Sequence, residues 1–308
     1  MVKTKLNAPS RREALLAAAA AVCAPRAGAA PGALPTVKLG PHTVSRLIVG
    51  GNPVSGNSHT SDGLGREMRE YFTAPNVMKL LRECEQAGIN TWQSRGDKRI
   101  QEFLNQHRLE GGRLQWIAQT ASELPDIPSH IRQLASVKPV GIYHHGSQTD
   151  RFWAARKIEQ AREMCKVMRD TGVQVGLGTH IPEVIDYVES KAWDVDFYMT
   201  CVYNISRPKE EQEKLAGGKV VGQLFWHPDR EKMLARVRQT SKPCLIFKVY
   251  GASRNCGSAE QMLEAVRLAA RYAKPTDAIV IGMFPKHTEQ VNQNCRLVMQ
   301  ALGETAAT

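Results

Sequence analysis

The sequence predicts an α/β protein built as a single (β/α)8 TIM barrel over residues 31–308. Two observations support this prediction. Strand-like segments alternate with helical segments eight times, which is typical of a parallel sheet closed by crossover helices. The strand segments are rich in Val, Ile and Leu on both faces, as expected of strands that are covered on both sides. A chain of 308 residues with 42% hydrophobic content is long enough for one such domain.

The first four strand-helix units precede residue 170. Apolar periodicity indicates the type of each element, and Gly and Pro mark the borders. A loop rich in Gly, Ser and Asn, residues 52–65, follows the first strand. The predicted strands are 46–51, 89–93, 114–120 and 140–145, and the predicted helices are 75–87, a segment ending at 107, 127–137 and 151–169.

The last four units follow in the same order. Their predicted strands are 173–178, 194–204, 244–250 and 278–283, and their helices are 182–191, 228–239, 258–273 and 288–302. A charged insertion at 208–218 is interpreted as a candidate mobile flap, with a solvated surface helix as the alternative. Because parallel barrel strands all end at one face, we expect the active site at their C-terminal ends.

Residues 1–30 have the order of a twin-arginine signal peptide. A basic start precedes Arg11-Arg12, and an Ala-rich stretch then leads to the small residues Ala27-Gly28-Ala29. We therefore expect the twin-arginine export machinery as a partner and a periplasmic or otherwise exported location. A disordered basic tail is the alternative. No segment has the roughly 20 consecutive apolar residues of a membrane span, so stable membrane insertion is not expected.

Net charge and cysteine spacing limit the classes of partner. The formal net charge is +11, part of it comes from residues 1–30, and the remaining basic residues are interspersed with acidic ones. We therefore expect no nucleic-acid partner, whereas a small anionic ligand such as a phosphate-bearing cofactor is compatible with the charge. The seven cysteines are scattered without a Cys-x-x-Cys pair, so neither a disulfide framework nor a zinc ribbon is predicted.

The fourth predicted strand ends in the most chemically active side chains. In residues 141–146, Gly-Ile-Tyr-His-His-Gly, alternation places Tyr143 and His145 on one face and His144 on the other. A phenol and an imidazole at the C-terminal end of a barrel strand can act as proton donors. The alternative is a polar rim whose histidines only hydrogen-bond to neighbouring loops.

Several short motifs occur in barrel order. They are Val44-Ser45-Arg46-Leu47, Ala87-Gly88-Ile89-Asn90, Gly176-Leu177-Gly178-Thr179-His180 with Pro182-Glu183, Tyr203-Asn204, and Glu289-Gln290-Val291 with Asn294. Together they resemble the aldo/keto reductase family across nearly all of residues 37–302. The resemblance implies a barrel that holds a nicotinamide dinucleotide, NAD or NADP, over its C-terminal end.

The catalytic set of that family is only partly present. The family has an aspartate and a tyrosine after strand two, a lysine ending strand three and a histidine ending strand four. His145 matches the histidine, whereas Gln93 replaces the aspartate, Gln119 replaces the lysine, and the shortened loop 95–97 lacks the tyrosine. In the family, the lysine and aspartate lower the pKa of the tyrosine, so their loss implies atypical catalysis. We expect Tyr143, His145, Gln93 and Gln119 as the catalytic residues.

The resemblance also implies a set of cofactor contacts. Thr179 replaces a Ser-Asn pair after strand five and Thr200 replaces a glutamine on strand six, and threonine can still hydrogen-bond a carboxamide. Lys286 and the start of the last helix can bind phosphate through charge and helix dipole. The full predicted set is Thr179, Thr200, Tyr203, Lys248, Lys286, Gln290 and Asn294.

These residues predict a nicotinamide-dependent oxidoreductase that acts on a small carbonyl or hydroxy compound. Three alternatives remain open at this point. Lys248 could form a Schiff base, which would make the protein a lyase or an isomerase. His144 or His145 could hold a metal ion with His180 and Cys201, although no spacing requires one. A barrel with so depleted a catalytic set could also be an inactive small-molecule binding protein.

Overall fold

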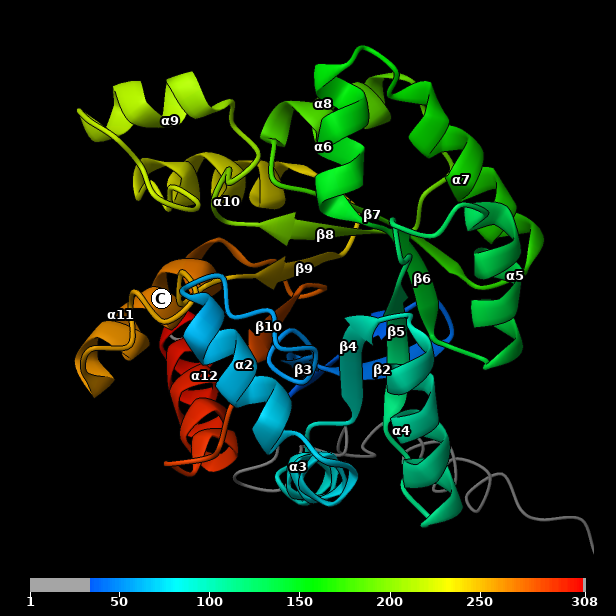
Figure 1. Ribbon diagram of the computed structural model, residues 1–308, viewed down its shortest axis with the longest axis vertical. Coiled ribbons are helices and arrows are strands. Elements are labelled where there is room, and N and C mark those ends of the chain that lie inside the picture. Colours follow the sequence, from blue (N-terminus) through cyan, green and yellow to red (C-terminus); the bar gives the residue numbers. More distant parts are fainter. Residues whose placement is uncertain (1–33, 307–308) are drawn as a thin grey trace, which may run out of the picture. The chain divides into compact units, whose positions relative to one another are not determined.

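The computed structural model describes residues 34–306 and contains a closed barrel of eight parallel strands (Figure 1). The strands pair in chain order, and the last strand closes the barrel against the first. The predicted TIM barrel is thereby confirmed. The barrel strands are β3 (Leu47–Gly50), β4 (Thr91–Arg95), β5 (Gln115–Gln119), β6 (Gly141–His144), β7 (Gln174–Thr179), β8 (Phe197–Cys201), β9 (Cys244–Phe247) and β10 (Ala278–Gly282).

Helices form the outer layer around these strands (Figure 1). They are α2 (Asp62–Tyr71), α3 (Ala74–Gln86), α4 (Lys98–Leu109), α5 (Ile127–Ser136), α6 (Gly146–Ala154), α7 (Glu159–Asp170), α8 (Pro182–Ser190), α9 (Lys209–Ala216), α10 (Pro228–Gln239), α11 (Ala259–Tyr272) and α12 (Gln290–Ala306). The side chains of Ser61, Asp97, Asp126 and Ser258 cap α2, α4, α5 and α11 by accepting hydrogen bonds from backbone N–H groups of the first turn. Proline lies in the first turn of α3, α5, α8 and α10, where its missing N–H costs no hydrogen bond.

An antiparallel hairpin that the sequence analysis did not predict precedes the barrel. β1 (Thr36–Leu39) pairs with β2 (His42–Ser45), and Gly40 makes the turn with a φ of +58°. Three side chains of the hairpin are buried in the apolar cluster that fills the barrel, namely Val37, Leu39 and Val44. Strands of four residues give too short an alternation to be recognised, which is why the hairpin was missed.

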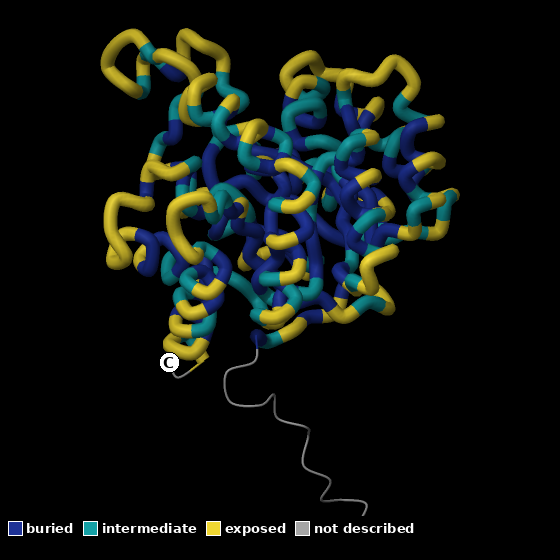
Figure 2. The backbone as a smooth tube through the Cα atoms, turned by 60° about the horizontal axis from the view of Figure 1, so that its bottom comes forward, coloured by how far each residue is buried: buried dark blue, intermediate teal, exposed yellow. Residues whose placement is uncertain are grey.

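The core has an inner and an outer part. Phe197 and Met199 belong to the cluster inside the barrel, whereas Tyr198 between them packs into the cluster beneath the helices. Figure 2 shows the buried backbone concentrated in the centre and the exposed backbone on the peripheral turns. Strand ends at the site are therefore held by packing on two sides.

Some predicted boundaries are corrected. The helix predicted at 151–169 is two helices, α6 and α7, separated by a turn in which Arg156 has a φ of 56°. The loop predicted at 52–65 contains the first residues of α2, and the insertion at 208–218 contains α9. The sixth and seventh barrel strands end at Cys201 and Phe247, earlier than predicted, because the chain turns there into the loops at the barrel end.

The predicted signal peptide, residues 1–30, lies outside the described residues, so it stays a prediction. Within residues 34–306, no helix is long and apolar enough to cross a membrane.

Candidate functional site

Polar side chains from neighbouring strands meet at the C-terminal end of the barrel, which we call the mouth. Alternation along a strand turns every second side chain toward the barrel axis. Near the strand ends, the side chains that alternation directs into the mouth are Gln93, Gln119, Tyr143, His145, His180 and Cys201. Apart from His145, these residues belong to two clusters of different chemistry.

The tyrosine cluster consists of Tyr143, Gln93 and Gln119. The buried Tyr143 hydroxyl accepts a hydrogen bond of 2.7 Å from Gln93 Nε2 and donates one of 2.8 Å to Gln119 Oε1. Burial raises the pKa of Tyr143 far above its usual range, so the phenol stays neutral. The structure thus brings three predicted catalytic residues together, but as a neutral hydrogen-bonding group.

His145 lies beside these residues at the end of β6. Its Nδ1 is 2.8 Å from Ser122 Oγ, and its backbone N–H donates to Thr120 Oγ1. Burial lowers the pKa of His145 to about 4, and the positive charges of His180 and Lys248 act in the same direction. At neutral pH the ring is therefore uncharged and able to accept a proton.

His144 faces away from the mouth, as alternation predicts. Its Nδ1 lies 2.7 Å from Thr149 Oγ1, and its ring stacks on Phe152 with centroids 5.8 Å apart. It lines a separate cavity of about 240 Å³ between α5 and α7. His144 is therefore not part of a metal set with His180, and residues 34–306 contain no group of three or more His, Cys, Asp or Glu placed to hold a metal ion.

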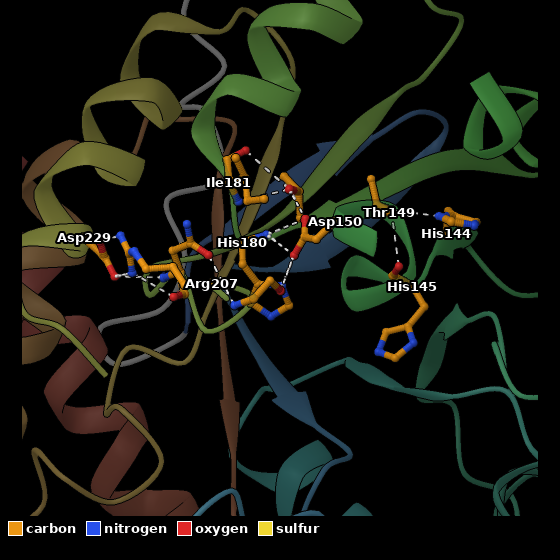
Figure 3. Close-up of polar contacts among 11 residues, drawn as sticks. His144, His145, Thr149, Asp150, His180, Ile181, Arg207 and Asp229 are labelled. Carbon is orange, nitrogen blue, oxygen red and sulfur yellow. Dashed lines mark hydrogen bonds and ion pairs between the residues drawn. The ribbon is translucent and has the colours of Figure 1, made fainter. Parts of the chain in front are cut away.

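The second group, the thiol–imidazole cluster, consists of Asp150, His180 and Cys201. Asp150 on α6 is 2% exposed, and it accepts hydrogen bonds of 2.6 Å each from His180 Nδ1, Thr179 Oγ1 and Ser206 Oγ. Burial alone would raise the pKa of this carboxyl, but the three donors outweigh it and lower the pKa. Figure 3 shows His180 directed at Asp150, while His144 and His145 point elsewhere.

The charge on His180 follows from its two partners. Burial alone would lower its pKa, but the interactions with Cys201 and Asp150 raise it to about 9. The ring is therefore an imidazolium at neutral pH, in contrast to His145. Its edge also packs against the Phe247 ring, with centroids 5.9 Å apart.

A cavity leads outward from the mouth toward α2, α11 and α12. It has a volume of about 520 Å³, and Gln93 and Phe247 line its inner end. Three of the predicted cofactor residues, Lys248, Gln290 and Asn294, line its wall. Two of them already hold neighbours in place, since Gln290 Oε1 accepts from the Phe284 N–H and Asn294 Oδ1 accepts from the Tyr250 hydroxyl.

Lys248 follows β9 at the wall of this cavity. It has a φ of 61°, a left-handed conformation that is uncommon for a side-chain-bearing residue. Its Nζ lies 5.1 Å from the centroid of the Phe247 ring. Burial lowers the pKa of the Lys248 amine, and the interaction with neighbouring Cys201 acts in the opposite direction.

The structure places the other four predicted cofactor residues away from the cavity wall. Thr179 is engaged by Asp150, and Thr200 Oγ1 is buried without a hydrogen-bond partner among the described residues. The Tyr203 hydroxyl accepts a hydrogen bond from Asn255 Nδ2, and its ring packs on Phe225. Lys286 forms an exposed ion pair of 2.7 Å with Glu67.

Asp150 is the site residue that the sequence analysis missed. It lies within a helix, 30 positions before its partner His180, and no spacing rule links the two. The only signal was Thr179-His180 at the end of a barrel strand, which was interpreted as a cofactor contact and a metal ligand. Parallel strands bring such ends together, so a carboxylate partner could be expected but not located.

Comparisons with known proteins identify the fold alone. No family model matches the chain, and no curated protein matches it. Among solved structures, the apo form of Gox0644 aligns with a TM-score of 0.53 and 8% identity over 89% of this chain and 94% of that chain. A truncated 3-deoxy-D-arabino-heptulosonate 7-phosphate synthase from Thermotoga maritima aligns with a TM-score of 0.50 and 12% identity over 89% and 93%. A glycerol dehydrogenase, AKR11B4 from Gluconobacter oxydans, aligns with a TM-score of 0.49 and 14% identity over 88% and 95%.

Proposed function

We propose that the protein is an atypical oxidoreductase that exchanges hydride between a nicotinamide dinucleotide and a small carbonyl or hydroxy compound. The observation that supports this function best is the cavity of about 520 Å³, which joins Gln93 in the mouth to the first residues of α11 and α12. The sequence resemblance to aldo/keto reductases supports the same function.

The outer end of the cavity suits the phosphates of a dinucleotide. Ser258 at the start of α11 and Gln290 at the start of α12 both line it. Backbone N–H groups at a helix start, together with the helix dipole, favour an anion. Lys248 on the same wall adds a positive charge. Two converging helix starts and a lysine are a suitable environment for a pyrophosphate.

The inner end of the cavity suits the reacting carbonyl or hydroxyl group. Gln93 lines this end and also holds the Tyr143 hydroxyl, so it connects the cavity to the tyrosine cluster. His180 carries a proton at neutral pH and His145 does not, so the first can donate a proton and the second can accept one. A dinucleotide bound in the cavity would supply or accept the hydride.

Binding of the dinucleotide tests this proposal. NADH and NADPH are titrated against the full-length protein, and binding is followed by nucleotide fluorescence. We expect the Lys248→Gln variant to bind at least roughly tenfold more weakly, because a charge-assisted contact contributes about 1.5–3 kcal/mol. Lys286→Gln is the matched control, since Lys286 is exposed and paired with Glu67, and it should change affinity less than twofold. Failure of both nucleotides to bind at millimolar concentration would reject the proposal.

A Schiff-base lyase is the second candidate, because Lys248 is held at the cavity with a lowered pKa. An uncharged amine can attack a carbonyl carbon, with loss of water, to form an imine. Borohydride reduction in the presence of a small aldehyde or ketone would then add the compound covalently to Lys248. A mass increase on the peptide that contains Lys248, absent from Lys248→Gln, would favour the lyase over the oxidoreductase.

A further inference from the structure

The cavity of about 240 Å³ between α5 and α7 has no part in the proposed hydride transfer. Ile127 of α5, Phe152 of α6 and Met164 of α7 supply its apolar surface. Gln160 and Glu163 of α7 also line it and are exposed, so the cavity opens to solvent on that side. An apolar cavity of about 150 Å³ holds benzene. The larger volume here is sufficient for a molecule of one or two fused rings.

The hydrogen bonds around His144 determine which nitrogen of its ring carries the proton. Nδ1 lies 2.7 Å from the Thr149 hydroxyl oxygen (Figure 3), a length typical of an O–H donor and shorter than is usual for an N–H donor. The His145 carbonyl oxygen, 3.2 Å from the same hydroxyl, already accepts the backbone N–H groups of Gln148 and Thr149 at 2.9 Å each. Both lone pairs of that oxygen are therefore occupied, and the Thr149 hydroxyl donates to Nδ1 of His144. The proton of the neutral ring is then on Nε2.

The Nε2–H group of His144 is a donor without an acceptor. Burial lowers the pKa of His144 to about 3, and the interaction with His145 acts in the same direction, so the ring is uncharged at neutral pH. Nε2 has no hydrogen-bond partner within residues 34–306. The unpaired polar atoms that are fully enclosed include Gln148 Oε1 but not His144 Nε2, so this nitrogen keeps some accessible surface. Because the ring is only 2% exposed and lines the cavity, that surface faces the cavity.

The remaining polar groups of the cavity are mostly engaged. Thr120 Oγ1 accepts the backbone N–H of His145, and Ser122 Oγ lies 2.8 Å from Nδ1 of the same residue. Glu163 is the charged residue of the lining, and it forms an exposed ion pair of 2.7 Å with Lys166. The cavity thus combines apolar walls with a free N–H donor and without an unpaired charge.

We infer that this cavity binds a small, uncharged aromatic molecule whose single hydrogen-bond acceptor receives the Nε2–H of His144. An acceptor at this point satisfies a donor that is otherwise buried without a partner. The rings of His144 and Phe152 lie within 22° of parallel, and together with the Met164 thioether they are favourable neighbours for a flat ring. The inference goes beyond the proposed hydride transfer and requires no dinucleotide.

Titration with quinoline and naphthalene tests the inference. The two probes have the same fused-ring shape, but only quinoline has a ring nitrogen that accepts a hydrogen bond. They are added at neutral pH to the full-length protein labelled with ¹³C in its methionine methyl groups. Met164 lines the cavity in question and Met262 lines the larger cavity at the mouth, so the two methyl signals report the place of binding. We expect quinoline to shift the Met164 signal to saturation and to leave the Met262 signal in place.

A variant of His144 tests the hydrogen bond itself. His144→Phe keeps a ring beside Phe152 but has no N–H group. The ratio of quinoline affinity to naphthalene affinity should fall about tenfold in this variant, because one hydrogen bond is lost. Taking the ratio cancels the changes in cavity volume and in hydrophobic transfer, which affect both probes alike. Met262→Leu, which also assigns the Met262 signal, is the control and should leave the ratio unchanged.

The possible results decide the inference in either direction. If quinoline leaves the Met164 signal unshifted up to its solubility limit, the cavity is not its site and the inference is overturned. An affinity ratio that stays the same in folded His144→Phe overturns the hydrogen bond to the ligand.

The parent protein decides the hydrogen bond even if His144→Phe does not fold. In protein labelled with ¹⁵N in its histidine rings, Nε2 of His144 should carry the proton, and its signal should move when quinoline is added. A proton on Nδ1, or an Nε2 signal that does not move, overturns the inference. None of these results depends on dinucleotide binding, so the proposed oxidoreductase function keeps its own separate test.

Discussion

The two clusters at the barrel mouth are both buried, but they differ in charge. In the tyrosine cluster, the Tyr143 hydroxyl exchanges neutral hydrogen bonds with Gln93 and Gln119, and burial keeps it un-ionised. In the thiol–imidazole cluster, Asp150 receives three short hydrogen bonds and remains a carboxylate opposite the charged ring of His180. Burial alone therefore does not determine charge; the number and type of donors does.

The difference has an energetic consequence. Losing a partner from a neutral buried pair costs the desolvation of one polar group, about 1–3 kcal/mol. Losing one member of a buried ion pair leaves an uncompensated charge and costs about 3–5 kcal/mol. Substitutions in the thiol–imidazole cluster should therefore lower the free energy of unfolding more than substitutions in the tyrosine cluster.

The largest effect is expected for Asp150→Ala. The change removes the carboxylate that His180 needs and leaves the hydroxyls of Thr179 and Ser206 without their acceptor. We expect the free energy of unfolding in urea to fall by about 3–5 kcal/mol. Asp194→Ala is the control, because Asp194 is exposed and pairs with Arg169 on the surface, and it should cost less than about 1 kcal/mol. Equal losses of unfolding free energy in the two variants would contradict the predicted difference between a buried and an exposed ion pair.

A smaller effect distinguishes the two histidines by pH. The raised pKa of His180, about 9, means that its stabilisation is complete below the unfolded value near 6.5 and is lost as pH rises from 6.5 to 9. The lowered pKa of His145, about 4, means that its contribution is complete above 6.5 and is lost as pH falls from 6.5 to 4. Each slope is at most about 1.4 kcal/mol per pH unit.

Urea unfolding at pH 4.5, 6.5 and 8.5 measures these slopes. His180→Gln should flatten the alkaline side of the stability profile and His145→Gln the acid side. If His180→Gln kept the parent's loss of stability between pH 6.5 and 8.5, the imidazolium assignment would be wrong. This result would also weaken the comparison between the clusters, since the thiol–imidazole cluster would then hold a carboxylate without a charged partner ring.

The fold was predictable because its signals repeat. Eight strand-helix units, each with apolar residues on both strand faces, leave few architectures other than a parallel barrel. Features that depend on a single short stretch of sequence were not predicted. The hairpin of β1 and β2 has only four residues per strand, and a left-handed turn at Arg156 divides what helical periodicity alone presents as one helix.

The site was predictable where strand alternation decided it. Gln119 and Tyr143 are register partners on adjacent strands, and Gln93 lies on the next strand two residues before the partner of Gln119. All three side chains alternate toward the mouth, where they meet. Asp150 could not be found in the same way, because its place depends on how α6 packs over the end of β7. The same packing engages Thr179, which the sequence analysis had interpreted as a cofactor contact.

The smallest effect is expected within the barrel strands, where two buried tyrosines differ in the hydrogen bonds of their hydroxyl groups. Tyr143→Phe removes the phenol oxygen between two amide groups, so we expect the free energy of unfolding to fall by about 1–2 kcal/mol. The Tyr198 hydroxyl is buried without a hydrogen-bond partner among the described residues, so Tyr198→Phe removes an unpaired polar group and should be neutral or slightly stabilising. Both changes delete one oxygen atom from a buried ring, so transfer and packing contributions nearly cancel between them. If Tyr143→Phe lowered the free energy of unfolding no more than Tyr198→Phe, Gln93 and Gln119 would have found other hydrogen-bond partners. The hydrogen bonds of the tyrosine cluster would then make no net contribution to stability.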